Sequence, residues 1–86
     1  MKFEPGKVFI TRALNSEDKY DEISACFLRH LIGDWGNLCD EDKFLNDLSV
    51  ESGGRILSAY NTSFGKIYII TEEDRSYTTI MFANEY

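Results

Sequence analysis

The last third of the chain constrains the fold most, because it holds three short runs of β-type residues joined by short connections. The runs are "RILSAY", "KIYIIT" and "YTTIMF", all rich in β-branched and aromatic residues. Connections as short as "NTSFG" and "EEDRS" favour hairpins. The pattern predicts a three-stranded antiparallel meander. A sheet this small needs other elements to cover one of its faces.

The first part of the chain predicts one strand and two helices. "KVFIT" (Lys7 to Thr11) indicates a short strand, and from Ser16 to Ile32 the apolar residues recur at helical spacing before Gly33. We expect the apolar side of this helix to comprise Tyr20, Ile23, Phe27 and Leu31, widened by Leu28 and Ile32. A second helix is expected after an Asp40 N-cap, with Phe44, Leu45 and Leu48 as its apolar side and Gly53-Gly54 as its stop.

These elements predict a single α+β domain over residues 1–86. Its order is β-α-α-β-β-β, with two helices packed on the three-stranded antiparallel meander. The first strand could join an edge of that meander. A chain of 86 residues has little room for both a core and a deep pocket.

The charge is negative and uneven. The chain carries a net charge of −6, and the segment from Asp34 to Glu51 holds six acidic residues against one basic residue. Because nucleic acid is a polyanion and no basic stripe interleaves with aromatics along the chain, no direct nucleic-acid partner is expected. The acidic segment is either a solvated helix face or a docking surface for a basic partner. The candidate partner-binding residues are Asp34, Trp35, Asp40, Glu41, Asp42, Asp74 and Arg75.

No apolar run approaches the roughly 20 residues that span a bilayer, and the first residues, "MKFEPGKVFI", lack a signal-peptide core. A cytoplasmic protein without membrane contact is expected. In that compartment Cys26 and Cys39 are thiols and not a disulfide.

"GDWGN" lies between the two predicted helices. Trp35 is either an apolar plug at the corner where the helices meet or an exposed binding side chain flanked by acids. Burial is the expectation, because a small domain rarely leaves so large a side chain unused. The expected neighbours are Leu31, Ile32, Leu38 and Phe44.

His30 is the only histidine, and a structural role, with a hydrogen bond to Asp34, is expected. The alternative is a minimal hydrolase in which His30 activates Cys39 or Ser58, and it requires His30 to face a cleft. The sequence contains no zinc, calcium, phosphate-loop or dinucleotide motif. No catalytic residue, metal or cofactor is therefore predicted.

Three stretches resemble a family of small bacterial proteins carried on plasmids, integrated elements and phages and described as plasmid-related. They are "RHLIGDWGNLCDEDKFLND", "GGRILSAY" and "KIYIITEEDRSYTTIMFANEY". They match the family pattern R-H-x-x-G-D-W-G, G-x-R-I-L-S-x-Y and I-T-E-x-D-R-S-x-T-T, within a resemblance covering about Val8 to Tyr86. The chain departs from the pattern at Phe82-Ala83-Asn84, where the family often has Leu-Pro. The resemblance implies a bacterial or mobile-element setting and brings no enzymatic activity.

The leading hypothesis is a non-enzymatic accessory protein that acts by binding another protein. One alternative is an acidic inhibitor that mimics the charge of DNA and blocks a nucleic-acid-binding protein. The other is the His30 hydrolase.

Overall fold

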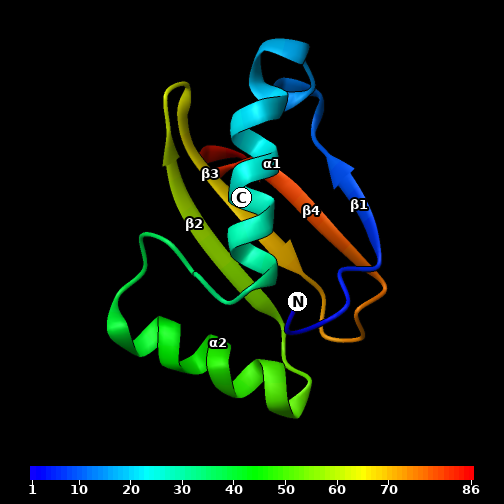
Figure 1. Cartoon of the computed structure of the whole chain (residues 1–86), viewed down its shortest axis with the longest axis vertical. Helices are drawn as coiled ribbons and strands as arrows, with labels where there is room; N and C mark the ends of the chain where they lie inside the picture. The colour runs from blue at the N-terminus through cyan, green and yellow to red at the C-terminus, as the bar shows by residue number, and fades with distance from the viewer.

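The sheet has four strands, one more than the predicted meander. The computed structural model describes all 86 residues. Strands β2 (Ile56–Thr62), β3 (Gly65–Thr71) and β4 (Tyr77–Phe82) form the antiparallel meander, and β1 (Lys7–Ile10) lies parallel beside β4. The strand order is β1-β4-β3-β2, and the sheet is therefore mixed (Figure 1). The α+β class is confirmed, whereas the purely antiparallel meander was an incomplete prediction.

The two helices occupy different positions. Helix α1 (Glu17–Leu31) lies across one face of the sheet, after a short 3-10 helix η1 (Arg12–Leu14). Helix α2 (Asp40–Ser52) lies beyond the end of the sheet and contacts it chiefly at β2 (Figure 1). A second 3-10 helix, η2 (Ala83–Glu85), follows β4. One face of the sheet is thus covered by a helix, and the other, which we call the open face, is not.

The core lies between α1 and the sheet. Its larger cluster comprises Leu14, Ile23, Cys26, Tyr60, Ile67, Ile69 and Ile80. A smaller cluster at the end of α1 comprises Phe3, Leu31, Trp35 and Ile56. The predicted apolar side of α1 is too wide, because Leu28 and Ile32 are 62% and 61% exposed. They lie on α1 outside the stripe that meets the sheet.

The "GDWG" segment runs along the outer edge of β2. The amide of Asn37 donates to the Ala59 carbonyl oxygen (2.6 Å), and the Ala59 amide donates to the Trp35 carbonyl oxygen (3.2 Å). Gly36 between them has a φ of 75°, and a Cβ there would clash with the Ala59 carbonyl oxygen. Glycine at this position therefore lets the "GDWG" segment approach β2 closely enough to pair with its outer edge.

Trp35 is buried, with 3% of its surface exposed, and the corner-plug prediction is confirmed. Of its expected neighbours, Leu31 and Leu38 belong to the surrounding cluster. The other two were wrong, because Ile32 and Phe44 are 61% and 60% exposed. Neither helix is long and apolar enough to cross a bilayer.

Candidate protein-binding surface

The local sequence of α2 explains where the helix begins and ends. Cys39 occupies the N-cap position, one residue before the predicted cap, and three acids follow in the first turn, where the helix dipole favours negative charge. Gly53 ends the helix with a φ of 89°, a left-handed conformation that suits glycine. The second helix is thus formed close to the predicted bounds.

The side of α2 that meets the rest of the fold is largely polar, and its apolar contact with the smaller core cluster is made by Val50. The side-chain amide of Asn46, 7% exposed, donates to the Leu57 carbonyl oxygen (2.8 Å) and accepts from the Leu57 amide (3.3 Å). This pair of bonds satisfies the backbone of β2 in the way that a neighbouring strand would. Asn46 therefore fixes both the position and the rotation of α2 against the sheet edge.

Two further contacts hold α2 in place. The indole nitrogen of Trp35 donates to Oδ1 of Asp47 (2.9 Å). The guanidinium of Arg75 donates to the carbonyl oxygens of Ser49 (2.7 Å) and Gly54 (2.6 Å), close to the C-terminal end of the helix. Carbonyl oxygens at a helix end lack partners within the helix, so a cation there satisfies them and complements the dipole.

The apolar side of α2 faces solvent as a consequence. Phe44, Leu45 and Leu48 are 60%, 50% and 47% exposed. These residues form the apolar side of the helix as predicted, but the expectation that both helices pack on the meander fails for α2, because this side does not meet the sheet. Because α2 is oriented by the hydrogen bonds of Asn46, Asp47 and the helix end, its apolar side is the one left over. We call these three side chains the α2 apolar patch.

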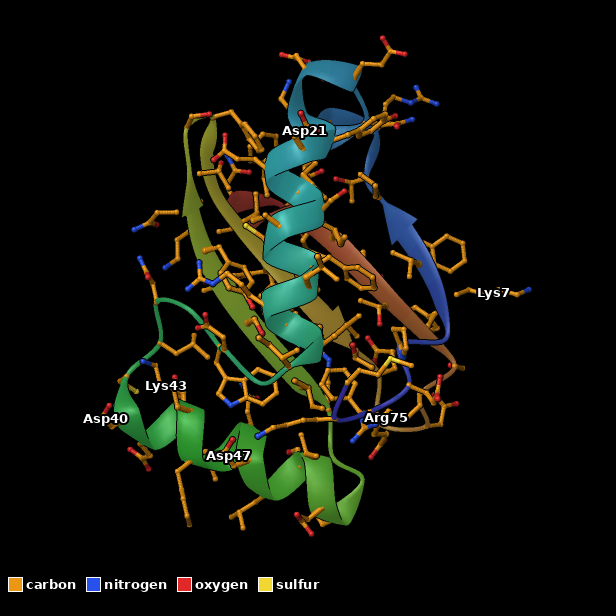
Figure 2. All side chains as sticks on the ribbon, in the orientation of Figure 1. Lys7, Asp21, Asp40, Lys43, Asp47 and Arg75 are labelled. Atoms are coloured by element: carbon orange, nitrogen blue, oxygen red, sulfur yellow. The ribbon has the colours of Figure 1, made fainter.

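Acidic residues surround this patch. At helical spacing, Phe44 neighbours Asp40 and Asp47, Leu48 neighbours Glu51, and Leu45 neighbours Glu41 and Asp42. All five acids are exposed. Asp40 lies at one end of the helix and Asp47 on the side turned toward Trp35 (Figure 2).

A shallow hollow adjoins the patch, with a volume of about 250 Å³. It is lined by Leu38, Asp42, Leu45, Asn46 and Leu57. The hollow continues the apolar surface from α2 onto β2 and places a carboxylate at its border.

The remaining predicted partner-binding residues make contacts within the chain. Asp34 accepts two bonds from the Arg29 guanidinium (2.7 and 3.2 Å), which lowers the pKa of the Asp34 carboxyl below its ordinary value. Asp74 accepts from the amide and hydroxyl of Ser76 (3.0 and 2.6 Å), and the hydroxyl bond is the main reason that the Asp74 pKa is lowered. Arg75 has a φ of 60° and is half-buried against α2. The structure thus gives Asp34, Asp74 and Arg75 local structural contacts.

His30 lies in a buried chain of hydrogen bonds, and its predicted bond to Asp34 is absent. Its Nδ1 atom lies 2.5 Å from Oγ of Ser58, and its Nε2 atom lies 2.9 Å from Oγ1 of Thr71. Oγ1 of Thr71 lies 2.7 Å from Oγ1 of Thr78, which donates to the Pro5 carbonyl oxygen (2.7 Å).

The last acceptor in this series of hydrogen bonds, the Pro5 carbonyl oxygen, fixes the position of every proton in the series. Because the Pro5 carbonyl can only accept, the Thr78 hydroxyl donates there and must accept from Thr71. The Thr71 proton is then used, so Nε2 of His30 carries hydrogen and donates to Thr71. Nδ1 is left as an acceptor for the Ser58 hydroxyl. The buried polar side chains are therefore all satisfied.

His30 and Ser58 have the pairing that a general base and a nucleophile need, but neither reaches solvent. Both are 0% exposed, and neither lines any of the three cavities. Burial lowers the pKa of His30 to about 3, which keeps the ring neutral near pH 7. Phe3 and Trp35 pack their rings against it. This environment is that of a structural histidine.

The two cysteines are free thiols. Cys26 is buried, and this burial raises the pKa of its thiol, while Cys39 is exposed. No group of three or more His, Cys, Asp or Glu side chains is placed to hold a metal ion.

No family model matches the chain, and comparison with curated proteins and with solved structures gives no match either. The α2 apolar patch is also what sequence reasoning missed. The pattern of Phe44, Leu45 and Leu48 predicts that a helix forms, but the two bonds of Asn46 that turn it are set by β2, which is distant in sequence.

Proposed function

We propose that this protein acts by binding another protein, through the α2 apolar patch and the hollow beside it. The observation that carries the proposal is the orientation of α2, which buries Asn46 and exposes Phe44, Leu45 and Leu48. An 86-residue chain that leaves three large apolar side chains together on one helix has a surface typical of interaction sites.

The charges around the patch indicate the kind of partner. Asp40, Glu41, Asp42, Asp47 and Glu51 border the patch. A partner surface with apolar anchors and adjacent lysines or arginines complements this arrangement, because opposite charges steer association while the apolar contact supplies affinity. A mimic of DNA would present rows of acids on a polar surface. Three exposed apolar side chains among the acids favour a protein contact over charge mimicry.

We also propose a bacterial mobile-element setting for this protein, which the sequence resemblance implies. The motifs around "RHLIGDWG" and "ITEEDRSYTT" point to bacterial mobile elements, so the partner is sought in a bacterial host. The role is that of an accessory factor without catalysis of its own. The closed environment of His30 and Ser58 supports this role over that of a hydrolase.

The test is affinity capture from a bacterial lysate, followed by direct binding to the purified partner. Leu48→Lys places a cation in the patch and should abolish binding, whereas Leu28→Lys makes the same change at an exposed leucine of α1 and should not. Reversal of Asp40, Glu41 and Asp42 to Lys should weaken binding and make it less sensitive to salt. A partner that binds Leu48→Lys as tightly as the wild type would refute the proposal.

A further inference from the structure

The open face of the sheet carries aromatic rings and cations that are far apart in the sequence. Register places Lys7 and Phe9 of β1 beside Tyr77 and Thr79 of β4, and these side chains point away from α1 because Thr78 and Ile80 point into the core. The sequence alone does not show that Lys7, Phe9 and Tyr77 lie together, because β1 and β4 are at opposite ends of the sequence.

Two pairs of rings lie on this face. Phe9 and Tyr77 meet edge to face with centroids 6.0 Å apart, and they are 52% and 41% exposed. Tyr68 of β3 and Tyr86 meet in the same way, with centroids 5.7 Å apart. One strand separates β1 from β3, so β3 lies about 10 Å from β1 across the sheet, and the register offsets Tyr68 from Phe9 by a further two residues along the strands.

Cations flank both pairs. Lys7 projects from β1 at the free edge of the sheet (Figure 2). Lys66 Nζ lies 5.6 Å from the centre of the Tyr68 ring, and the Arg55 guanidinium lies 5.3 Å from that of Tyr86. Of the acids near this face, Glu73 and Asp74 in the loop before Tyr77 are exposed, whereas Glu72 and Glu85 have partners. Glu72 pairs with Arg55 (3.6 Å), and Glu85 accepts from the Thr11 hydroxyl (2.9 Å) and the Phe82 amide (2.8 Å).

The negative charge of the chain is concentrated elsewhere. Most of it lies between Asp34 and Glu51, in and before α2, which lies beyond the end of the sheet next to the start of β2 (Figure 1). β1 is the opposite edge, three strand spacings or about 14 Å from β2. Phe9 and Tyr77 thus lie on β1 and on the strand beside it, away from the strand that α2 chiefly contacts.

We propose that the open face of the sheet binds single-stranded nucleic acid. Bases stack on the exposed rings of Phe9, Tyr77 and Tyr86, with the half-buried Tyr68 ring against Tyr86, while Lys7 and Lys66 contact the phosphates. Stacking of this kind requires base faces that a duplex keeps covered, so a single strand is the ligand that the surface fits. This site is separate from the α2 apolar patch, and it revises the expectation of no nucleic-acid partner that followed from net charge and from spacing along the chain.

The test is a fluorescence anisotropy titration of a labelled thymidine octamer with the full chain at low salt. Phe9→Thr and Tyr77→Thr keep a residue suited to a strand and should each weaken binding about five- to a hundredfold. Lys7→Gln and Lys66→Gln should each lower the slope of log affinity against log salt by about 0.7. Leu28→Ala and Lys19→Gln, on the helix that covers the other face, are the matched controls and should leave affinity unchanged.

Thermal melting confirms that each variant is folded before its affinity is compared. Absence of binding at millimolar protein, or binding that Phe9→Thr and Tyr77→Thr leave unchanged, would overturn the proposal. Competition by a duplex or by poly-glutamate as strong as that by the unlabelled octamer would also overturn it, because it would show attraction to charge without stacking.

Discussion

The two helices differ in which side they bury: α1 buries its apolar side, whereas the apolar side of α2 is exposed. Helix α1 buries Ile23 and Leu31 against the sheet, and the polar group that it buries, His30, is fully hydrogen-bonded. Helix α2 buries Asn46 and exposes Phe44, Leu45 and Leu48. An apolar side on a helix therefore does not by itself identify the core. When hydrogen bonds to another element fix the rotation of a helix, its apolar side becomes a surface.

The largest expected effect comes from the buried ring at the junction of the helices. Trp35→Ala should lower the free energy of unfolding by about 3–5 kcal/mol, because it removes a ring that is 3% exposed and leaves a cavity. Phe44→Ala removes another aromatic ring but one that is 60% exposed, and it should change the free energy by less than about 0.5 kcal/mol. Urea unfolding of both variants makes the comparison. Similar losses would mean that α2 packs by its apolar side.

The second prediction concerns the polar core under α1. His30→Gln should cost about 1–3 kcal/mol at pH 7, because glutamine cannot reach Ser58 and Thr71 with the geometry of the ring. Urea unfolding at pH 7 measures this loss. Retention of full stability would show that the hydrogen-bond chain contributes nothing.

The pH dependence of the free energy of unfolding tests the role of His30 separately. His30 has a pKa of about 3 in the fold and about 6.5 in the unfolded chain, so below pH 6.5 the unfolded state takes up a proton that the folded state does not. Stability is thus full above pH 6.5 and falls as pH decreases toward 3, by up to about 1.4 kcal/mol per unit. Between pH 6 and 5 the wild type should lose stability and His30→Gln should stay nearly level. Equal slopes would assign the loss to other groups.

A smaller effect is expected where α2 meets β2. Asn46→Ala removes both bonds to the Leu57 backbone and should cost about 1 kcal/mol, at the low end for a lost hydrogen-bond partner, because water can reach the edge strand. Amide exchange in α2 should become faster while exchange in α1 and β3 stays unchanged. Uniformly faster exchange would show that the helix is not anchored separately.

Several parts of this structure were predictable from sequence. The runs "RILSAY", "KIYIIT" and "YTTIMF" predicted the three antiparallel strands, and Gly33 and Gly53 marked helix ends. The parallel pairing of β1 with β4 was not predictable, because register between distant strands depends on which face α1 covers. The rotation of α2 was equally hidden, since Asn46 has no pattern that predicts its pairing with Leu57.

Some features of the candidate sites were likewise predictable from sequence, and others depended on tertiary contacts. The acids around α2 were visible in the sequence, and the structure shows them exposed around the α2 apolar patch. Asp34 and Asp74 are exposed and Arg75 is half-buried, but all three have partners within the chain, namely Arg29, Ser76 and the end of α2, which turns and tertiary contacts supply. Sequence reasoning therefore located charge well and apolar exposure poorly.

The smallest effect on stability and the largest on binding are expected at Leu48. Leu48→Gln should leave the free energy of unfolding within about 0.5 kcal/mol, because the side chain is 47% exposed. Chemical denaturation measures this directly. A loss of several kcal/mol would place Leu48 in the core.

The claim that α2 presents a binding surface is tested most directly by mapping amide NMR shifts on titration with a lysine–leucine amphipathic helical peptide. We expect the largest shifts on residues 44–51 and on Leu57 beside the hollow. Leu48→Gln should weaken binding at least tenfold and Leu28→Gln should not, while a glutamate–leucine peptide of the same pattern should bind far more weakly. Shifts centred away from α2, or equal binding of the acidic peptide, would contradict the account.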